Sequence, residues 1–252
     1  MTRSPRAQYA YICTCLLIRA INVALHLYLI TSAYSYESEA FKNNSMENMK
    51  EYQTHMQEKP IFSIIGEKVA LGPIRRELIP LYQRWINDFE VLRTLHIPRP
   101  STLEEIQASY EADVAAERQR KVVYFTIYDR DTLQPIGRTD LCNINYRDRT
   151  ADFGIEIGEA AYRGRGYGTE TIRLMLDYAF TGLGLHNIML ETWEYNRAGQ
   201  GAYKKAGFQE IGRRHQAKFM NGKFWDIVYM ECLSTEFVSP VLGQILVPDE
   251  LR

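Results

Sequence analysis

The stretch A-D-F-G-I-E-I-G-E-A-A-Y-R-G-R-G-Y-G, residues 151–168, decides how this chain folds. In its first part the apolar residues Phe153, Ile155 and Ile157 alternate with aspartate, glycine and glutamate. This period of two predicts a β-strand with two distinct faces. The run R-G-R-G-Y-G at 163–168 follows, and its glycines favour a loop over either a strand or a helix.

From Thr169 the spacing of the apolar residues changes to that of a helix. Apolar residues now recur at intervals of three and four, as on one helical face: Ile172, Met175, Leu176, Ala179 and Phe180. Charged residues at 170, 173 and 177 fall on another face, where they can form ion pairs along the helix. The segment therefore predicts a strand, a glycine loop and a helix, in that order.

The glycine loop has the chemistry of an anion-binding site. The first N–H groups of a helix have no partner within the helix and lie at the positive end of its dipole. Glycines let a bulky phosphate approach these amides, and Arg163 and Arg165 add mobile positive charge suited to two or more phosphates. The alternative is a turn with a geometric role alone.

The spacing of the loop argues against two common nucleotide-binding motifs. The dinucleotide pattern G-x-G-x-x-G requires a third glycine where this chain has Thr169, and the triphosphate pattern requires a lysine that does not follow these glycines. Residues 163–168 instead read R-x-x-G-x-G. This segment resembles the acyl-coenzyme A loop of the GNAT N-acetyltransferase superfamily, which lies between the fourth strand and the following helix.

A second motif further along the chain agrees with this resemblance. Residues 188–193 read as a short buried strand, Asn196 can cap a helix, and Gly207 stands where a helix commonly ends. The order N-x-x-G-x-x-x-Y-K-K-A-G-F at 196–208 is similar to the C-terminal signature of the same superfamily. Two motifs in the right order are more specific than either motif alone.

The resemblance covers 68–237 and implies the fold class. We expect one mixed α/β domain with a twisted, mostly antiparallel sheet and helices on both faces. Strands are expected at 68–73, 122–128, 136–146, 151–157 and 188–193, followed by a hairpin of 209–215 and 223–232 around the N-G turn at 221–222. Residues 238–252 are expected to form a loosely packed C-terminal tail.

Two helices before the second strand form the wall that selects the acceptor in this family. They are expected from Glu77 onward and from Ser101 or Thr102 to about residue 120. The motif W-I-N-D-F-E-V at 85–91 resembles the first-helix region of a subgroup of acetyltransferases. That subgroup contains the ribosomal-protein N-terminal (alanine or serine) enzymes and sugar-amine enzymes.

The resemblance also implies acetyl-CoA as the acetyl donor and no metal cofactor. In the family the fourth and fifth strands are parallel neighbours that splay apart. The pantetheine arm of the donor enters the gap, and the pyrophosphate rests on the amides of the glycine loop. Carried onto this sequence, the cofactor-binding residues are Ile155, Glu156, Ile157, Arg163, Gly164, Arg165, Gly166, Tyr167, Gly168, Thr169, Asn196 and Tyr203.

The implied reaction needs an acid for the leaving thiolate and a neutral amine. Tyr203 matches the family tyrosine that protonates the sulfur, and packing within its helix is the alternative role. The base is open among Glu156, Glu191 in the next strand and Asp152, or bulk water at alkaline pH. Asn196 matches a position that hydrogen-bonds the cofactor arm, and helix capping explains it almost equally well.

Composition limits the other classes of function. The net charge is −1 and no arginine-rich block occurs, so nothing favours nucleic acid as a partner. The four cysteines make no metal-ligand pattern, and a reducing, cytoplasmic compartment fits them.

Residues 1–60 are expected to lie outside the folded domain. A mostly apolar stretch at 9–30 invites a signal-peptide or membrane-anchor interpretation, but Arg19 and two further polar residues interrupt it. No run of about 20 apolar residues remains, so membrane attachment is not favoured. We expect an upstream extension, with translation starting near Met46, and a disordered polar lead-in at 35–60.

The sequence thus predicts an N-acetyltransferase that modifies a primary amine. A protein N-terminus is the first expectation for the acceptor, because of the motif at 85–91. Polyamines, amino sugars and aminoglycosides remain alternatives, as do a non-catalytic acyl-CoA-binding module and a membrane-attached protein. A homodimer stays open.

Overall fold

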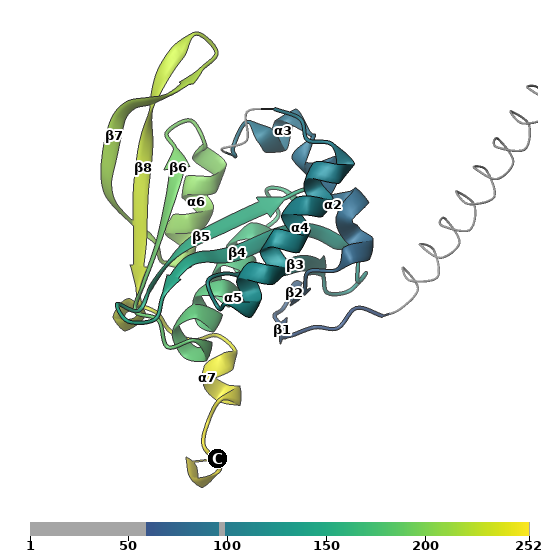
Figure 1. Cartoon of the computed structure of the whole chain (residues 1–252). Helices are drawn as coiled ribbons and strands as arrows, with labels where there is room; N and C mark the ends of the chain where they lie inside the picture. The colour runs from purple at the N-terminus through teal and green to yellow at the C-terminus, as the bar shows by residue number, and fades with distance from the viewer. Residues whose placement is uncertain (1–58, 96–98, 252) are drawn as a thin grey trace, which may run out of the picture. The chain divides into compact units, whose positions relative to one another are not determined.

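The computed structural model describes residues 59–95 and 99–251. The expectations for the apolar stretch at 9–30, for Met46 and for the lead-in up to residue 58 lie outside these residues. The described residues belong to one unit that begins at Lys59. It is a mixed α/β fold built on an eight-stranded sheet in the order β1-β2-β3-β4-β5-β6-β8-β7 (Figure 1).

The strands and helices follow one another along the chain in the expected order. The strands are β1 (Ile64–Ile65), β2 (Val69–Pro73), β3 (Val123–Asp129), β4 (Pro135–Asn145), β5 (Thr150–Ile157), β6 (Asn187–Trp193), β7 (Gln209–Met220) and β8 (Lys223–Leu233). The longer helices are α2 (Ile79–Ile86), α4 (Leu103–Arg118), α5 (Tyr167–Asp177) and α6 (Arg197–Ala206). Short helical turns are η1 (Arg76–Leu78), α3 (Phe89–Leu92), η2 (Ala160–Tyr162), η3 (Tyr178–Gly182), η4 (Ser234–Glu236), α7 (Leu242–Ile245) and η5 (Asp249–Leu251).

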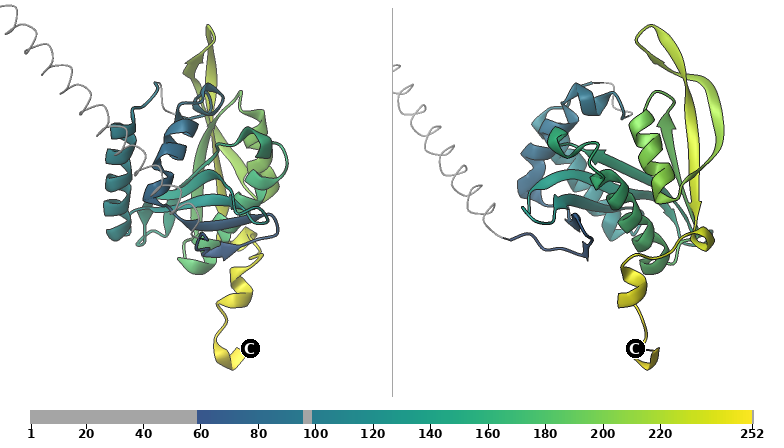
Figure 2. Two further views of the ribbon diagram at one scale, coloured as in Figure 1. Left: turned by 90° about the vertical axis from the view of Figure 1, so that its right-hand side faces the viewer. Right: turned by 180° about the vertical axis from the view of Figure 1, so that it is seen from behind.

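The sheet is antiparallel at every step except between β5 and β6, which confirms the expected fold class. Helices cover both faces, with α2 and α4 on one side and α5 and α6 on the other (Figure 2). The larger core joins the sheet to α5, whose Ile172, Met175 and Leu176 are buried as the helical spacing predicted. A smaller core lies under α2 and α4 around Tyr82 and Trp85.

Local signals in the sequence fix several element ends. Thr102 caps α4 and forms a capping box with Glu105, which confirms the expected start of that helix. The N-G turn also forms, because Asn221 and Gly222 both adopt positive φ angles of 52° and 71°. The strands of that hairpin are longer than expected, and the hairpin extends beyond the rest of the sheet (Figure 2).

One missed strand, one helix start and one divided motif differ from the sequence expectations. The two-residue strand β1 was missed, because so short an edge strand has no alternating pattern to detect. The helix after the glycine loop begins at Tyr167 rather than Thr169, with Gly166 as its N-cap. The motif at 85–91 spans the end of α2 and the start of α3, because Asp88 accepts a hydrogen bond from the Glu90 amide and starts a new turn.

The C-terminal tail is anchored rather than loosely packed throughout. The Asp177 carboxylate, which is fully buried, accepts hydrogen bonds from the Ser239 hydroxyl at 2.5 Å and from the Val241 and Leu242 amides at 2.9 and 2.8 Å. A carboxylate at the start of α7 satisfies amides that the short helix cannot pair itself. The sequence pattern placed Asp177 on the charged helical face, where ion pairs along the helix were expected, and so missed this role.

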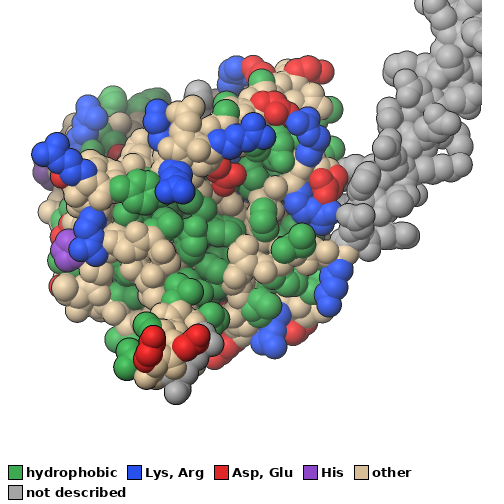
Figure 3. All heavy atoms as spheres, turned by 60° about the horizontal axis from the view of Figure 1, so that its bottom comes forward, with side chains coloured by type: hydrophobic (Ala, Val, Ile, Leu, Met, Phe, Trp, Pro, Cys, Tyr) green, Lys and Arg blue, Asp and Glu red, His purple; other side chains and the backbone are tan. Residues whose placement is uncertain are grey.

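Beyond this anchor the tail keeps apolar side chains exposed. Val238, Ile245, Leu246 and Leu251 are more than half exposed. Figure 3 views the end of the molecule from which the tail emerges and shows apolar side chains gathered there, with lysine and arginine side chains around them.

In the described part of the chain, no helix is both long enough and apolar enough to cross a membrane.

We predict that Asp177→Ala lowers the free energy of unfolding by about 3 kcal/mol. The two tail amides and the Ser239 hydroxyl lose their acceptor, as does the Thr181 hydroxyl, which donates to Asp177 at 2.9 Å. Ser239→Ala removes only one of these bonds and should cost about 1 kcal/mol. Urea unfolding of both variants and the wild type measures the two effects. An Asp177→Ala variant as stable as the wild type would contradict the anchoring role.

Candidate active site

The glycine loop ends in a helix start that is open to an anion. Gly166, the N-cap of α5, has a φ of +93°, and Gly164 has a φ of +72°, both in the region that favours glycine. No side chain among the described residues caps this helix. The first amides of α5, from Tyr167 to Thr169, are therefore available to a phosphate.

The two parallel strands beside the loop part from each other. β5 pairs with β6 only from Thr150, opposite Asn187, to Asp152, opposite Met189. Beyond that point β5 continues to Ile157 and, within residues 59–95 and 99–251, pairs with β4 alone. The splaying that the family resemblance implied is confirmed, and it leaves one edge of the β5 backbone facing a gap.

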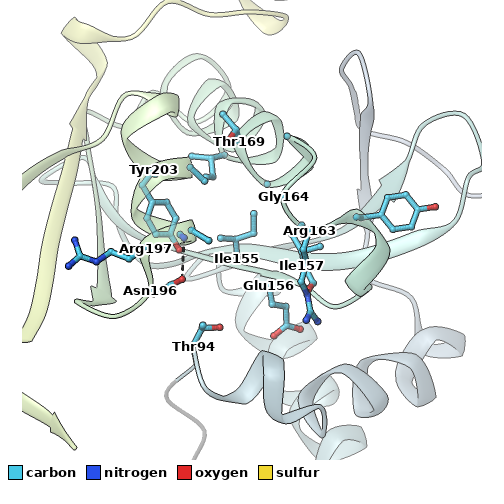
Figure 4. Close-up of a pocket in the computed structure, with 18 of the residues that line it drawn as sticks. Thr94, Ile155, Glu156, Ile157, Arg163, Gly164, Thr169, Asn196, Arg197 and Tyr203 are labelled. Carbon is cyan, nitrogen blue, oxygen red and sulfur yellow. Dashed lines mark hydrogen bonds between the residues drawn. The ribbon is translucent and has the colours of Figure 1, made fainter. Parts of the chain in front are cut away.

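A cavity of about 560 Å³ fills this gap (Figure 4). Four segments line it: residues 155–157 of β5, the glycine loop, the first turns of α6 and residues 90–94 at the end of α3. Figure 4 shows Ile155 on the side of β5 that faces Tyr203, and Glu156 on the side that faces Thr94. The cavity thus brings together the two motifs that the sequence singled out.

Tyr203 stands in the wall of the cavity. Its ring packs edge-on against Phe153 and Phe208, with ring centroids 6.4 and 6.0 Å away. Burial raises the pKa of the Tyr203 phenol to about 12, so the hydroxyl stays protonated at neutral pH. Within the described residues, no group hydrogen-bonds this hydroxyl, which leaves its proton free for a ligand in the cavity.

Asn196 lines the cavity, but its side chain already caps the N-terminus of α6. Its Oδ1 accepts the Gly199 amide at 3.1 Å, and its Nδ2 donates to the Thr192 hydroxyl at 3.2 Å (Figure 4). The expected capping of α6 is therefore present. The contact with a cofactor arm that the resemblance implied stays a prediction.

The two arginines of the glycine loop are engaged by the protein, contrary to the expected mobility. Arg163 lines the cavity, but its guanidinium donates to the carbonyl oxygens of Ile157 at 2.9 Å and Gly158 at 2.8 Å. Arg165 donates to the Ala161 carbonyl at 3.2 Å and does not line the cavity. Main-chain carbonyls near a glycine loop compete for arginine, and no sequence pattern reveals this.

The remaining loop residues divide between cavity and scaffold. Gly164, Gly166, Gly168 and Thr169 line the cavity. Tyr167 does not, because its hydroxyl donates to Asp129 at 2.6 Å, a hydrogen bond that raises the pKa of the phenol to about 12. The loop therefore presents main chain rather than side chains to a ligand.

Of the three carboxylates considered as the base, the structure places Glu156 in the cavity. Its side chain is only 9 % exposed, and Arg138 of β4 donates to it at 2.7 Å. Asp152 instead accepts from Asn143, and Glu191 is exposed on β6, outside the cavity lining. The alternation of side chains along the strands could not show which of the three lies in the cavity, because all three lie on the same face of the sheet.

The structure adds charged groups that sequence reasoning missed. Asp140 lies over Gly154, where a Cβ atom would come within 2.4 Å of its carboxylate. Burial, and then the charge of Glu156, raise the pKa of Asp140 to about 6. The Lys68 ammonium lies beside the glycine loop, 3.4 Å from the Arg165 carbonyl. A glycine in a strand signals a close approach, but nothing in the sequence pointed to Lys68.

Comparison with known proteins identifies the family. The model of the acetyltransferase (GNAT) domain matches residues 68–209, more than half of the chain. A spermidine N(1)-acetyltransferase of Vibrio cholerae is 30 % identical over 138 residues, which cover 55 % of this chain and 77 % of that protein. The human alpha/beta-tubulin N-acetyltransferase 9 is 26 % identical over 160 residues, 59 % of this chain and 75 % of the relative.

A solved structure extends the likeness to the fold. The crystal structure of the Vibrio cholerae spermidine N-acetyltransferase with CoA and spermine superposes with a TM-score of 0.62 and 25 % identity, covering 68 % of this chain and 98 % of that one. These relatives are polyamine and tubulin enzymes, not the ribosomal-protein enzymes that residues 85–91 suggested. The chain belongs to the GNAT acetyltransferase family and is an acetyl-CoA-dependent N-acetyltransferase.

Proposed function

We propose that this enzyme transfers the acetyl group of acetyl-CoA to a terminal primary amine of a polyamine. The observation that carries the proposal is the likeness to spermidine acetyltransferases in both sequence and structure, across nearly the whole length of the crystallised relative. The cavity supports it with Glu156 in its wall, on the side away from Tyr203, and with Asp140 nearby. Carboxylates on that side attract a cationic acceptor.

The donor is proposed to bind main chain to main chain. Its pyrophosphate would accept hydrogen bonds from the first amides of α5, at residues 167–169, where helix dipole and free N–H groups act together. Its pantetheine amides would pair with the free edge of β5 at Ile155, as an added strand would. Lys68 contributes positive charge beside the same loop.

The transfer then needs one attack and three proton transfers between the reacting groups. The acceptor ammonium gives a proton to the Glu156 carboxylate, and the neutral amine attacks the carbonyl carbon of the thioester. The C–S bond breaks as the amide bond is completed, and the leaving thiolate takes the proton of the Tyr203 hydroxyl. The nitrogen of the new amide gives its surplus proton to the phenolate, which restores the Tyr203 hydroxyl, and the Glu156 carboxyl releases its proton to solvent. The phenol can serve as donor because a tyrosine hydroxyl is protonated at neutral pH, and burial raises its pKa further, to about 12.

A peptide N-terminus is the second candidate acceptor. The likeness to the tubulin enzyme favours it, at 26 % identity over 160 residues. A thiol-release assay with acetyl-CoA separates the candidates when spermidine, spermine, an N-terminal peptide, an amino sugar and an aminoglycoside are compared. We expect the highest kcat/KM with a polyamine. If the peptide were the best substrate, the second candidate would replace the polyamine. If no amine released coenzyme A, the protein would be a non-catalytic acyl-CoA-binding module.

We predict that Tyr203→Phe lowers kcat about 100-fold, because the thiolate then leaves without a positioned acid. The ring remains, so the dissociation constant for acetyl-CoA should stay within about twofold. Steady-state kinetics and calorimetric titration with acetyl-CoA measure the two quantities. Tyr178→Phe, which alters a phenol on η3 packed against Phe125, is the control. Unchanged turnover in Tyr203→Phe would remove the assigned role.

We predict that Gly166→Ala weakens CoA binding about tenfold. The new Cβ strains a residue with φ of +93° and shifts the amides that meet the pyrophosphate. Gly184→Ala is the matched control, because Gly184 has a φ of +68° and open space around its Cβ but does not line the cavity. Calorimetric titration of both variants with CoA compares them. Equal affinities would show that the loop amides do not hold the donor.

A further inference from the structure

Residues 90–94, which we call the acceptor wall, are tied to a distant part of the chain. The Trp193 indole N–H donates to the Thr94 carbonyl at 3.1 Å. The Tyr195 hydroxyl donates to the Arg93 carbonyl at 2.7 Å. The two aromatic donors stand at the end of β6, about a hundred residues further along the chain, so the contacts are purely tertiary.

The acceptor wall needs an external anchor at this end. It includes the last residues of α3, which has only four residues. The Arg93 and Thr94 amides donate within this turn, to the carbonyls of residues 89 and 91, but a single helical turn is only marginally stable by itself. Val91 and Leu92 are buried and fix the middle of the segment. Its last two residues are held from outside by the two aromatic donors, and both residues line the cavity.

The donors themselves are held rigidly. Trp193 is only 2 % exposed, and the Lys218 ammonium lies 4.4 Å from the centre of its indole ring. The Trp225 ring meets the Tyr195 ring edge-on, with centroids 5.5 Å apart. Both supporting residues belong to the projecting β7–β8 hairpin (Figure 1). Burial raises the pKa of Tyr195 to about 12, so its hydroxyl remains a donor at neutral pH.

We propose that Trp193 and Tyr195 are positioning residues that set the place of the acceptor wall and thereby the enzyme's preference among amines. The inference rests on the proposed function, since it assigns this side of the cavity to the acceptor. The donor side lies across the gap, at the glycine loop and at Ile155. Loosening the wall therefore affects binding of the amine and leaves binding of acetyl-CoA intact.

The test compares Trp193→Phe, Tyr195→Phe and the double variant with the wild type. Each change keeps an aromatic ring and removes one hydrogen-bond donor. In the double variant we expect KM for the best acceptor to rise five- to tenfold. The ratio of kcat/KM for that amine to kcat/KM for the other amines should fall. The dissociation constant for acetyl-CoA should stay within twofold of the wild-type value. Tyr178→Phe is the control, because it likewise removes a phenol hydroxyl but lies on η3, packed against Phe125 and outside the cavity lining.

Hydrogen exchange gives a second reading that needs no turnover. Amides of the acceptor wall should exchange at least threefold faster in the double variant, and those of the glycine loop should not change. Unaltered exchange in the wall, or an acceptor KM equal to that of Tyr178→Phe, overturns the inference. A wild-type protein that acetylates no amine overturns the proposed function instead, and exchange alone then decides whether the two residues hold the wall.

Discussion

The parting of β5 from β6 after Asp152 is the constraint on which the rest of the structure depends. Backbone groups buried away from water are costly when unpaired, so an open strand edge within a sheet needs another partner. The same opening places the free amides of α5 at one end of the cavity and the Tyr203 phenol along its wall. A long donor with amides in its arm and phosphates at one end matches this arrangement.

The side chains around the opening chiefly hold main chain in place. Arg163 fastens the glycine loop to the end of β5, and Glu156 is held by Arg138, whose guanidinium stacks 4.9 Å from the Tyr82 ring. Trp85 leaves no room for a Cβ at Gly158, just after β5. In the proposed arrangement, recognition of the donor falls to the backbone, while the acceptor meets side chains. This division explains how one fold can keep its donor and change its acceptor.

Local patterns predicted the parts of the structure that depend on neighbours in sequence. The glycine loop, the Asn196 cap and the N-G hairpin turn could be identified because their geometry is set within a few residues. Local patterns could not predict that Arg163 binds main-chain carbonyls or that Glu191 lies outside the cavity. Both facts depend on which groups tertiary packing brings close together. The bonds from Trp193 and Tyr195 are of the same kind. The relatives favour the polyamine alternative over the acceptor subgroup that was expected first, because a seven-residue motif on the scaffold carries little information about the amine.

The crystal structure of the complex with coenzyme A tests the central claim most directly. The account predicts the pyrophosphate on the amides of residues 167–169, a pantetheine amide paired with the backbone of Ile155, and the sulfur within about 4 Å of the Tyr203 hydroxyl. A coenzyme bound elsewhere, or bound in the cavity through side chains with the β5 edge unpaired, would contradict it.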